Sequence, residues 1–323
     1  LMDADQKQRK ISSKKQLDAV IKENNTIAGL KKEVLKKCVN KIANEIANLA
    51  FYSENKDEVS WLAAAREKRE ESIRWRFYPI NNSLYEGLSG IVIFLAALRM
   101  CNITDKYKNI LETAINSLYV YTDKYAAENI NNFDTNVGAM SGESSIVYTY
   151  LVLYKLLKKN KFLEYAIKHA YLLEKGIEAD NNFDVLSGNA GAVLVLLQLY
   201  DLTGNRKILE LVIKAGEKLV YNAKKQNKGI GWNNIEEENA LAGFAHGNAG
   251  ISLSLLKLWK TTGDRIFLQS FEEALEYEDD LFDSVDGNWR DVRMVDHDIN
   301  DNKGVRPIAW CHGAGGIPLP CAG

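Results

Sequence analysis

The sequence has almost no net charge, few cysteines and no long apolar run. Its 41 Lys and Arg residues against 43 Asp and Glu residues leave no excess basic charge to bind nucleic-acid phosphates. Its four cysteines, Cys38, Cys101, Cys311 and Cys321, show no paired spacing, which argues against a disulfide framework and predicts a reducing, cytoplasmic compartment. No run of about 18 apolar residues is present that could span a bilayer.

What the sequence does have is a repeated glycine motif. It occurs at residues 83–90 (SLYEGLSG), 138–145 (GAMSGESS), 183–191 (FDVLSGNAG), 242–250 (AGFAHGNAG) and 309–317 (AWCHGAGGI). The motif glycines are Gly87, Gly142, Gly188, Gly247 and Gly313, with spacings of 55, 46, 59 and 66 residues. Residues 188–206 match residues 247–265 without a gap, at a constant offset of 59. Such spacing is typical of a protein built from repeated helical hairpins.

Apolar and one-faced helical segments alternate along the chain. Residues 91–98, 146–157, 190–200 and 251–259 are apolar on most sides, whereas residues 30–49, 107–125 and 162–175 carry one apolar face. Strand signals are weak. We therefore predict an all-α fold, a double-layered ring with the apolar helices inside, the amphipathic helices outside and the glycine turns gathered at one end. A functional site is expected at that end.

Three side chains beside the turns could carry chemistry. Cys311, followed by His312, would suit a soft metal such as zinc, although a lone buried cysteine commonly acts as a small apolar residue. His246 could face a cavity or hydrogen-bond to backbone at its helix start. Asp184, four residues before Gly188, could be catalytic or could cap the following helix.

Other acidic and histidine residues support different interpretations. Glu86 and Glu143 flank two further turns, and paired carboxylates across a ring, with Asp184, would suit a metal-independent glycosidase. His169 and His297 lie away from the turns, and we expect them to be structural or solvated. A non-catalytic helical scaffold that binds peptide is a third interpretation.

Taken together, the motifs at residues 83–90, 183–191, 243–250 and 309–317 resemble the signatures of LanC-like lanthionine cyclases, in the order found in that family. The resemblance covers the chain from about residue 30 to its end, and the Trp-Cys-His-Gly motif is most similar to the C-terminal cyclase domain of bifunctional, class II lanthipeptide synthetases. It implies an α/α toroid of seven helical hairpins, of which this chain carries five glycine turns.

The resemblance also implies roles for individual residues. Cys311 matches the first cysteine ligand of one catalytic zinc ion, His246 the acid/base histidine and Asp184 the catalytic aspartate. Arg306 lies near an arginine that assists catalysis in some members. The implied reaction is the addition of a peptide cysteine thiol to dehydroalanine or dehydrobutyrine, which forms the lanthionine or methyllanthionine rings of a lantibiotic precursor.

The chain departs from the family pattern after Cys311. The two other zinc ligands belong to a later Cys-His-Gly or Cys-Cys-Gly motif, which these 323 residues do not contain. Pro318 and Pro320 also stand where the next inner helix would begin. We therefore expect a C-terminally incomplete cyclase domain over residues 30–323, with an incomplete zinc site and little activity of its own.

Expected partners follow from the same resemblance. The substrate would be a precursor peptide with a leader and a dehydrated core, and no nucleic-acid partner is expected. Residues 1–29 are polar and rich in lysine, and would be a linker or the tail of an upstream dehydratase domain. Association with an export transporter would place the cytoplasmic protein at the inner face of the membrane.

Overall fold

The computed structural model of the chain describes residues 34–69, 72–101, 103, 105–127, 136–233, 239–292, 308–313 and 315–317. Several expectations from the sequence concern residues outside these ranges. The polar segment 1–29, His297, Arg306, the two prolines after Ile317 and Cys321 all lie outside the described residues.

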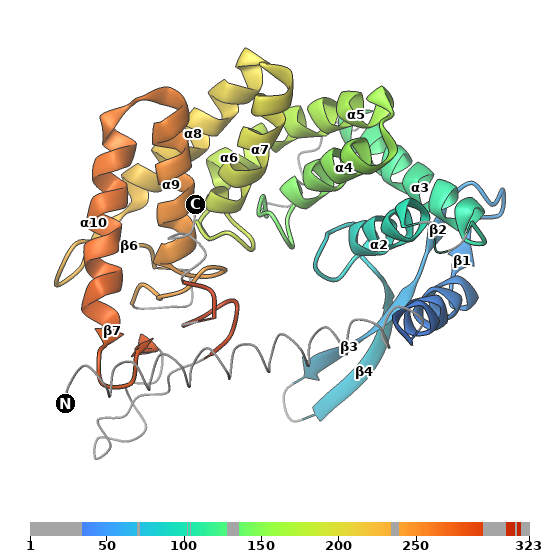
Figure 1. The fold of residues 1–323 in the computed structure, drawn as a ribbon, viewed down its shortest axis with the longest axis horizontal. Coiled ribbons are helices and arrows are strands. Elements are labelled where there is room, and N and C mark those ends of the chain that lie inside the picture. Colours follow the sequence, from blue (N-terminus) through green and yellow to red (C-terminus); the bar gives the residue numbers. More distant parts are fainter. Residues whose placement is uncertain are drawn as a thin grey trace, which may run out of the picture.

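Within these ranges, helical hairpins follow one another along an arc (Figure 1). The inner helices are α2 (Leu88–Met100), α4 (Ser144–Leu157), α7 (Asn189–Thr203) and α9 (Asn248–Thr262). The outer helices are α3 (Lys108–Ala127), α5 (Asn160–Ala170), α8 (Arg206–Asn222) and α10 (Arg265–Leu281), and α5 continues through η1 (Tyr171–Leu173) into α6 (Glu174–Ala179). Each inner helix begins at a glycine turn, as predicted, and the all-α ring architecture is confirmed.

The two layers differ in burial as their sequences predict. Helix α7 is buried on nearly every side, including Val193, Leu196 and Leu199. Helix α8 buries only one face, which includes Leu211 and Leu219, and its charged residues lie on the other side. The stripe of α8 therefore packs against the inner layer, and residues of both layers form the core.

The repeated Thr-Gly-Asn/Asp-Arg sequence ends one helix and starts the next. Gly204 and Gly263 close α7 and α9 in the left-handed region, at φ 61° and 75°. The side chain of Asn205 then accepts hydrogen bonds from the first amides of α8, and Asp264 does the same for α10. This stop and start gives two hairpins the same geometry.

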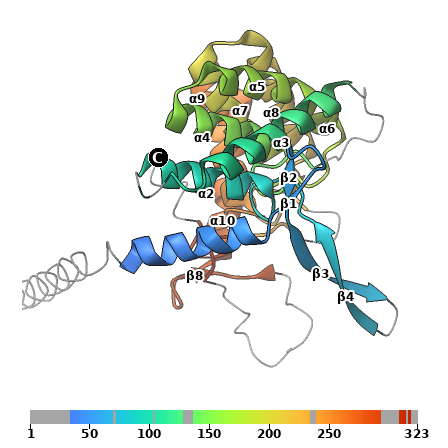
Figure 2. The ribbon, with the colours of Figure 1, turned by 90° about the vertical axis from the view of Figure 1, so that its right-hand side faces the viewer.

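Strands, which the sequence did not predict, occupy the connection before the first glycine turn. They are β1 (Phe51–Tyr52), β2 (Val59–Ser60), β3 (Leu62–Arg69) and β4 (Ser72–Pro79). The β3–β4 hairpin is antiparallel and points away from the helices (Figure 2). Arginines and aromatics alternate over residues 74–77, a period of two that favours a strand. Trp61, between β2 and β3, is buried and donates from Nε1 to Ile46 O at 2.7 Å.

Further short strand pairs connect the later hairpins. They are β5 (Lys224–Lys225) with β6 (Ile230–Gly231), and β7 (Phe282–Asp283) with β8 (Asn288–Trp289). Each sheet in the described part of the chain has two strands, so the helices alone form the layers of the ring.

The first predicted helix is less well packed than expected. It covers residues 34–48 and buries Ala43 completely, but Val34, Leu35 and Ile42 of its apolar positions are exposed. Its apolar face is therefore covered along only part of its width. In the described ranges, no helix is both long and apolar enough to cross a membrane.

The close approach of backbone at the motif glycines can be tested with a matched pair of substitutions. A Cβ atom at Gly188 would lie 2.4 Å from the backbone N of Phe183, whereas one at Gly204 would have no atom within 4 Å. We expect Gly188→Ala to lower the free energy of unfolding by about 3 kcal/mol through this clash. Gly204→Ala should cost about 1 kcal/mol, from its positive φ alone. Guanidinium denaturation measures both, and equal losses would contradict the clash.

Candidate functional site

The glycine turns lie against one another and are joined by backbone hydrogen bonds. Each link has the same form, in which the carbonyl two residues before a motif glycine accepts two N–H groups from a neighbouring turn. The three links are Leu84 and Tyr85 N to Met140 O, Met140 and Ser141 N to Leu186 O, and Val185 and Leu186 N to Ala245 O, at 3.0–3.2 Å. Four turns from distant parts of the sequence are therefore held in a fixed relative position.

The segment around Cys311 continues this arrangement. Cys311 also stands two residues before a motif glycine, Gly313. Its carbonyl oxygen lies 2.4 Å from the position that a Cβ atom of Gly243 would occupy, so the segment packs directly on the fourth turn. The ring of Trp310 lies 6.2 Å from that of Tyr85, in the first turn. Residues 308–313 therefore contact both ends of the arc of turns.

Asp184 and His246 are brought into direct contact. Asp184 Oδ2 lies 2.9 Å from His246 Nδ1, and Asp184 Oδ1 accepts a hydrogen bond from Ser187 N at 2.7 Å. The Asp184 side chain is 3% exposed and that of His246 is 30% exposed. Asp184 thus both stabilises its own turn and orients the histidine. When Nδ1 donates to this carboxylate, Nε2 carries the lone pair of the ring.

Cys311 is linked to the Asp184–His246 pair by the next residue in the sequence, His312. Cys311 is half-buried and in no disulfide, and the ring of His312 stacks on that of His246 with centroids 5.3 Å apart and 22° between the planes. The structure therefore joins Asp184, His246 and His312, with the backbone of Cys311 on the same turn. Among the described residues, no group of three His, Cys, Asp or Glu side chains could hold a metal ion.

His312 was noted in the sequence only as the neighbour of Cys311, and its stacking on His246 was not predicted, although the repeat register carries a signal for it. His246 and His312 both directly precede a motif glycine, as do Ser141 and Ser187. The hydroxyls of those two serines lie 3.0 Å apart. Side chains at this position of successive turns therefore meet, and the two histidines follow the same rule.

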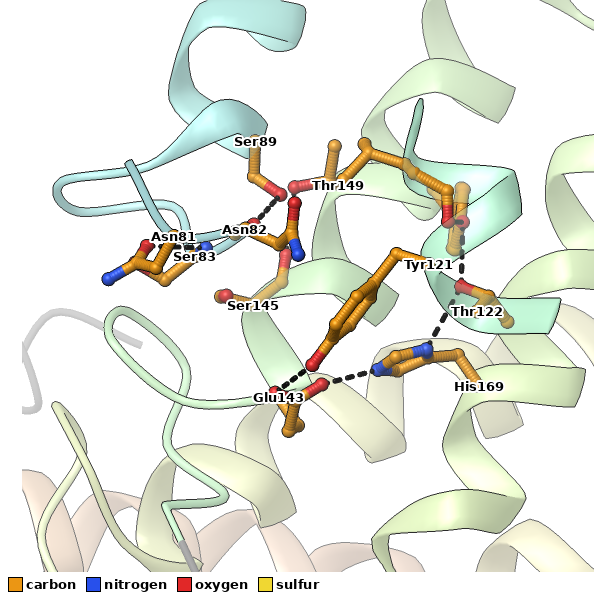
Figure 3. A network of polar contacts seen from close by, with 12 residues as sticks. Asn81, Asn82, Ser83, Ser89, Tyr121, Thr122, Glu143, Ser145, Thr149 and His169 are labelled. Atoms are coloured by element: carbon orange, nitrogen blue, oxygen red, sulfur yellow. Dashed lines mark hydrogen bonds and ion pairs between the residues drawn. The ribbon is translucent and has the colours of Figure 1, made fainter. Parts of the chain in front are cut away.

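Glu143, considered above as a carboxylate at the rim, is committed to a buried network (Figure 3). Its Oε1 accepts from the hydroxyl of Tyr121 at 2.8 Å, and its Oε2 lies 3.0 Å from His169 Nε2. His169 is fully buried, and its Nδ1 lies 3.1 Å from the hydroxyl of Thr122. Both oxygens of Glu143 are therefore occupied, which weighs against a glycosidase pair of Glu143 with the exposed Glu86.

The hydrogen bonds of this network need a definite number of hydrogen atoms. Four contacts follow in series, from Glu143 through His169, Thr122 and Tyr150 to the carbonyl of Leu118. A carboxylate and a neutral imidazole, with the two hydroxyls, supply three hydrogens for them. All four contacts are satisfied when the acid and the imidazole share one more proton. The series ends at a backbone carbonyl, so it fixes the second turn and leads no proton onward.

The orienting role of Asp184 can be separated from its role in the turn. Asp184→Asn keeps an acceptor for Ser187 N but replaces the carboxylate that faces His246 Nδ1. We expect nitrogen-15 NMR to show the Nδ1–H tautomer of His246 in the unchanged protein and a loss of that preference in Asp184→Asn. Asp184→Ala should lose, in addition, about 1 kcal/mol of unfolding free energy as Ser187 N loses its acceptor. An identical tautomer in all three proteins would disprove the orienting contact.

Comparisons with known proteins identify the family of the chain. The model of the family "Lanthionine synthetase C-like protein" matches residues 78–322. The lacticin 481/lactococcin biosynthesis protein LcnDR2 of Lactococcus lactis subsp. lactis is 24% identical over 278 residues, which cover 86% of this chain but only 27% of that protein. The solved structure of nisin cyclase shares the fold, with a TM-score of 0.52 and 19% identity over 74% of this chain and 63% of that one. The chain belongs to the lanthionine synthetase C-like family.

Proposed function

We propose that this chain closes thioether rings in a precursor peptide, as the cyclase part of a lanthipeptide synthetase. The observation that supports it most is the contact of Asp184 with His246, beside the Cys311 segment, in a member of this family. The names of the relatives, a lacticin biosynthesis protein and nisin cyclase, point to the same class of substrate.

The proposed reaction needs a base and then an acid, and His246 can serve as both. With Nδ1 bound to Asp184, Nε2 takes the proton from a cysteine thiol of the peptide. The thiolate attacks the β-carbon of a dehydroalanine or dehydrobutyrine. As the sulfur–carbon bond forms, the electrons of the double bond move to the neighbouring carbonyl and give an enolate. Protonation of the α-carbon by the imidazolium completes the ring with no net change in atoms or charge.

The finer parts of the proposal concern zinc, Arg306 and the rest of the protein. Zinc at Cys311 would lower the pKa of a bound substrate thiol, but the described residues do not form a complete ligand set. Arg306 is proposed to assist catalysis. An arrangement with an upstream dehydratase, a cytoplasmic location and contact with an export transporter belong to the same proposal.

Ring closure leaves the mass of the peptide unchanged, so it has to be followed through the thiols that it consumes. Each ring consumes one thiol, so alkylation with iodoacetamide followed by mass spectrometry counts the rings that formed. Because little activity is expected of residues 1–323 by themselves, the rates are compared in the complete synthetase that the proposal implies. With a dehydrated precursor and excess Zn²⁺, we expect His246→Ala to slow thiol loss at least about 100-fold, since it removes the proton-transfer group. Glu86→Gln, at an exposed position of another turn, should leave the rate unchanged. Equal rates for the unchanged protein and His246→Ala would overturn the proposal.

The zinc proposal has its own measurement. Tight zinc sites need three or four ligands in fixed geometry. Because the described residues offer no such group, we expect residues 1–323 to retain well below one zinc ion per chain after dialysis, and Cys311→Ala to retain less. Elemental analysis measures the zinc content per chain. One tightly held ion per chain would show that ligands outside the described residues complete the site.

A further inference from the structure

Each glycine turn has one N–H group that needs a hydrogen-bond acceptor, four residues before its motif glycine. In the first turn Asn81 Oδ1 accepts from Ser83 N at 2.9 Å. In the second turn Gly138 N donates to Ser187 O at 2.9 Å, and Asn136 Oδ1 lies within hydrogen-bond distance of the same N–H at 3.3 Å. Both asparagines stand six residues before the motif glycine. In the third turn Asn182 holds this position, and its backbone carbonyl accepts from Asp184 N at 2.8 Å.

The fourth turn solves the same problem differently. Leu241 stands six residues before Gly247, and its side chain cannot accept a hydrogen bond. Gly243 N donates instead to Glu278 Oε1 at 3.3 Å, from the outer helix α10. The backbone of the turn is otherwise equivalent, because Leu241 O accepts from Asn248 N at 2.9 Å just as Asn81 O accepts from Leu88 N.

Packing of the repeat does not explain a carboxyl group at this place. Helices α8 and α10 both have 17 residues and lie 59 residues apart in sequence, which pairs Glu278 with Leu219. Leu219 is completely buried, and Glu278 is 3% exposed. Its Oε2 has no hydrogen-bond partner among the described residues. Burial of a carboxyl group with an unpaired oxygen costs free energy that a leucine would not.

Glu278 accepts a hydrogen bond from the N–H group of Gly243, and the Cys311 segment packs on this same glycine. Gly243 has φ 133° and lies against Cys311 O and His312 Cα, and it precedes His246 by three residues. The same helix also lies near the residues that follow the Cys311 segment, because Tyr277 belongs to one buried apolar cluster with Ile317. Tyr277 also donates from its hydroxyl to Ala240 O at 2.6 Å.

We propose that Glu278 is a positioning residue, which fixes the fourth glycine turn so that Cys311 and His312 are seated beside His246. That this seating serves ring closure rests on the proposed function, whereas the seating itself does not. Glu278 thus supplies, from a neighbouring helix, the acceptor that the side chain of Asn81 supplies within the first turn.

The charge of Glu278 gives this contact a pH dependence. Burial raises the pKa of Glu278 to about 8, while the amides of Gly243 and Ala249 act to lower it and the nearby Asp279 raises it further. The cations on the adjoining segments, Lys228 and Arg290, bind Asp280, through its carboxylate and its carbonyl oxygen respectively. The folded protein therefore binds more protons than the unfolded chain between about pH 4.5 and 8, and Glu278's contribution to stability falls as pH rises through that window.

Three variants of the full chain test the proposal. Glu278→Leu introduces the residue of the sister helix, Glu278→Gln keeps an acceptor without charge, and Leu241→Asn with Glu278→Leu restores the acceptor used in the first turn. The readout is the rate at which iodoacetamide alkylates Cys311, relative to the exposed Cys38 and Cys101 in the same sample. Peptide mapping by mass spectrometry separates the sites, and carbon-13 NMR follows the rings of His246 and His312.

We expect Glu278→Leu to raise the relative alkylation rate of Cys311 about tenfold and to shift both histidine signals, because one buried hydrogen bond is lost. Glu278→Gln should change neither, and Leu241→Asn should reverse the effect of Glu278→Leu. The melting temperature of the unchanged protein should fall relative to that of Glu278→Gln between pH 5 and pH 8.

Unchanged alkylation and histidine signals in Glu278→Leu would overturn the proposal, as would failure of Leu241→Asn to restore them in a folded double variant. If Glu278→Leu does not fold, Glu278→Gln still tests the proposal, because a changed Cys311 alkylation rate or shifted histidine signals in this variant, which keeps the acceptor, would overturn it. None of these measurements uses a peptide substrate. Their outcome is therefore the same whether or not the chain has cyclase activity, and the two proposals can fail separately.

Discussion

The structure depends on one repeated interaction, the pair of N–H groups that each of the first three glycine turns gives to a carbonyl of the next turn. The accepting carbonyl always stands two residues before its motif glycine, in the second, third and fourth turns. They require backbone to approach backbone, which the glycines permit, and they leave side chains free to point toward a common centre. The apolar helices fix the thickness of the ring, but the bonded turns fix where its functional groups stand.

The Asp184–His246 contact is a consequence of this series of hydrogen bonds between turns, called the ladder below. The two residues are 62 positions apart in sequence, yet each stands next to a link of the same ladder, at Val185 and at Ala245. Their contact therefore needs no adjustment of either turn. The buried Glu143–His169 pair anchors the second turn from behind, and Glu278 anchors the fourth. Polar groups within this helical core are concentrated where a turn has to be held.

The sequence predicted the helices, their layers and the gathering of turns, because the period of apolar residues and the spacing of glycines encode these directly. It did not predict β3 and β4, since their pairing depends on cross-strand contacts more than on local propensity. It placed Asp184, His246 and Cys311 at the turns through their motifs, and their roles stay predictions, but it missed Glu278. A lone glutamate on an amphipathic helix looks solvated, and only its burial in the structure shows that Glu278 occupies the place of the buried Leu219 in the repeat. Arg306 remains a prediction.

The joint between residues 308–313 and the first turn differs in kind from the others. In the described residues it is made by the rings of Tyr85 and Trp310, which are tilted by 47°. Aromatic rings keep favourable contact over a range of offsets and angles, whereas a backbone hydrogen bond weakens steeply as it is misaligned. A change in the distance between residues 308–313 and the first turn is therefore accommodated most easily here. The Tyr85–Trp310 contact would adjust while the hydrogen bonds among the four turns keep their geometry.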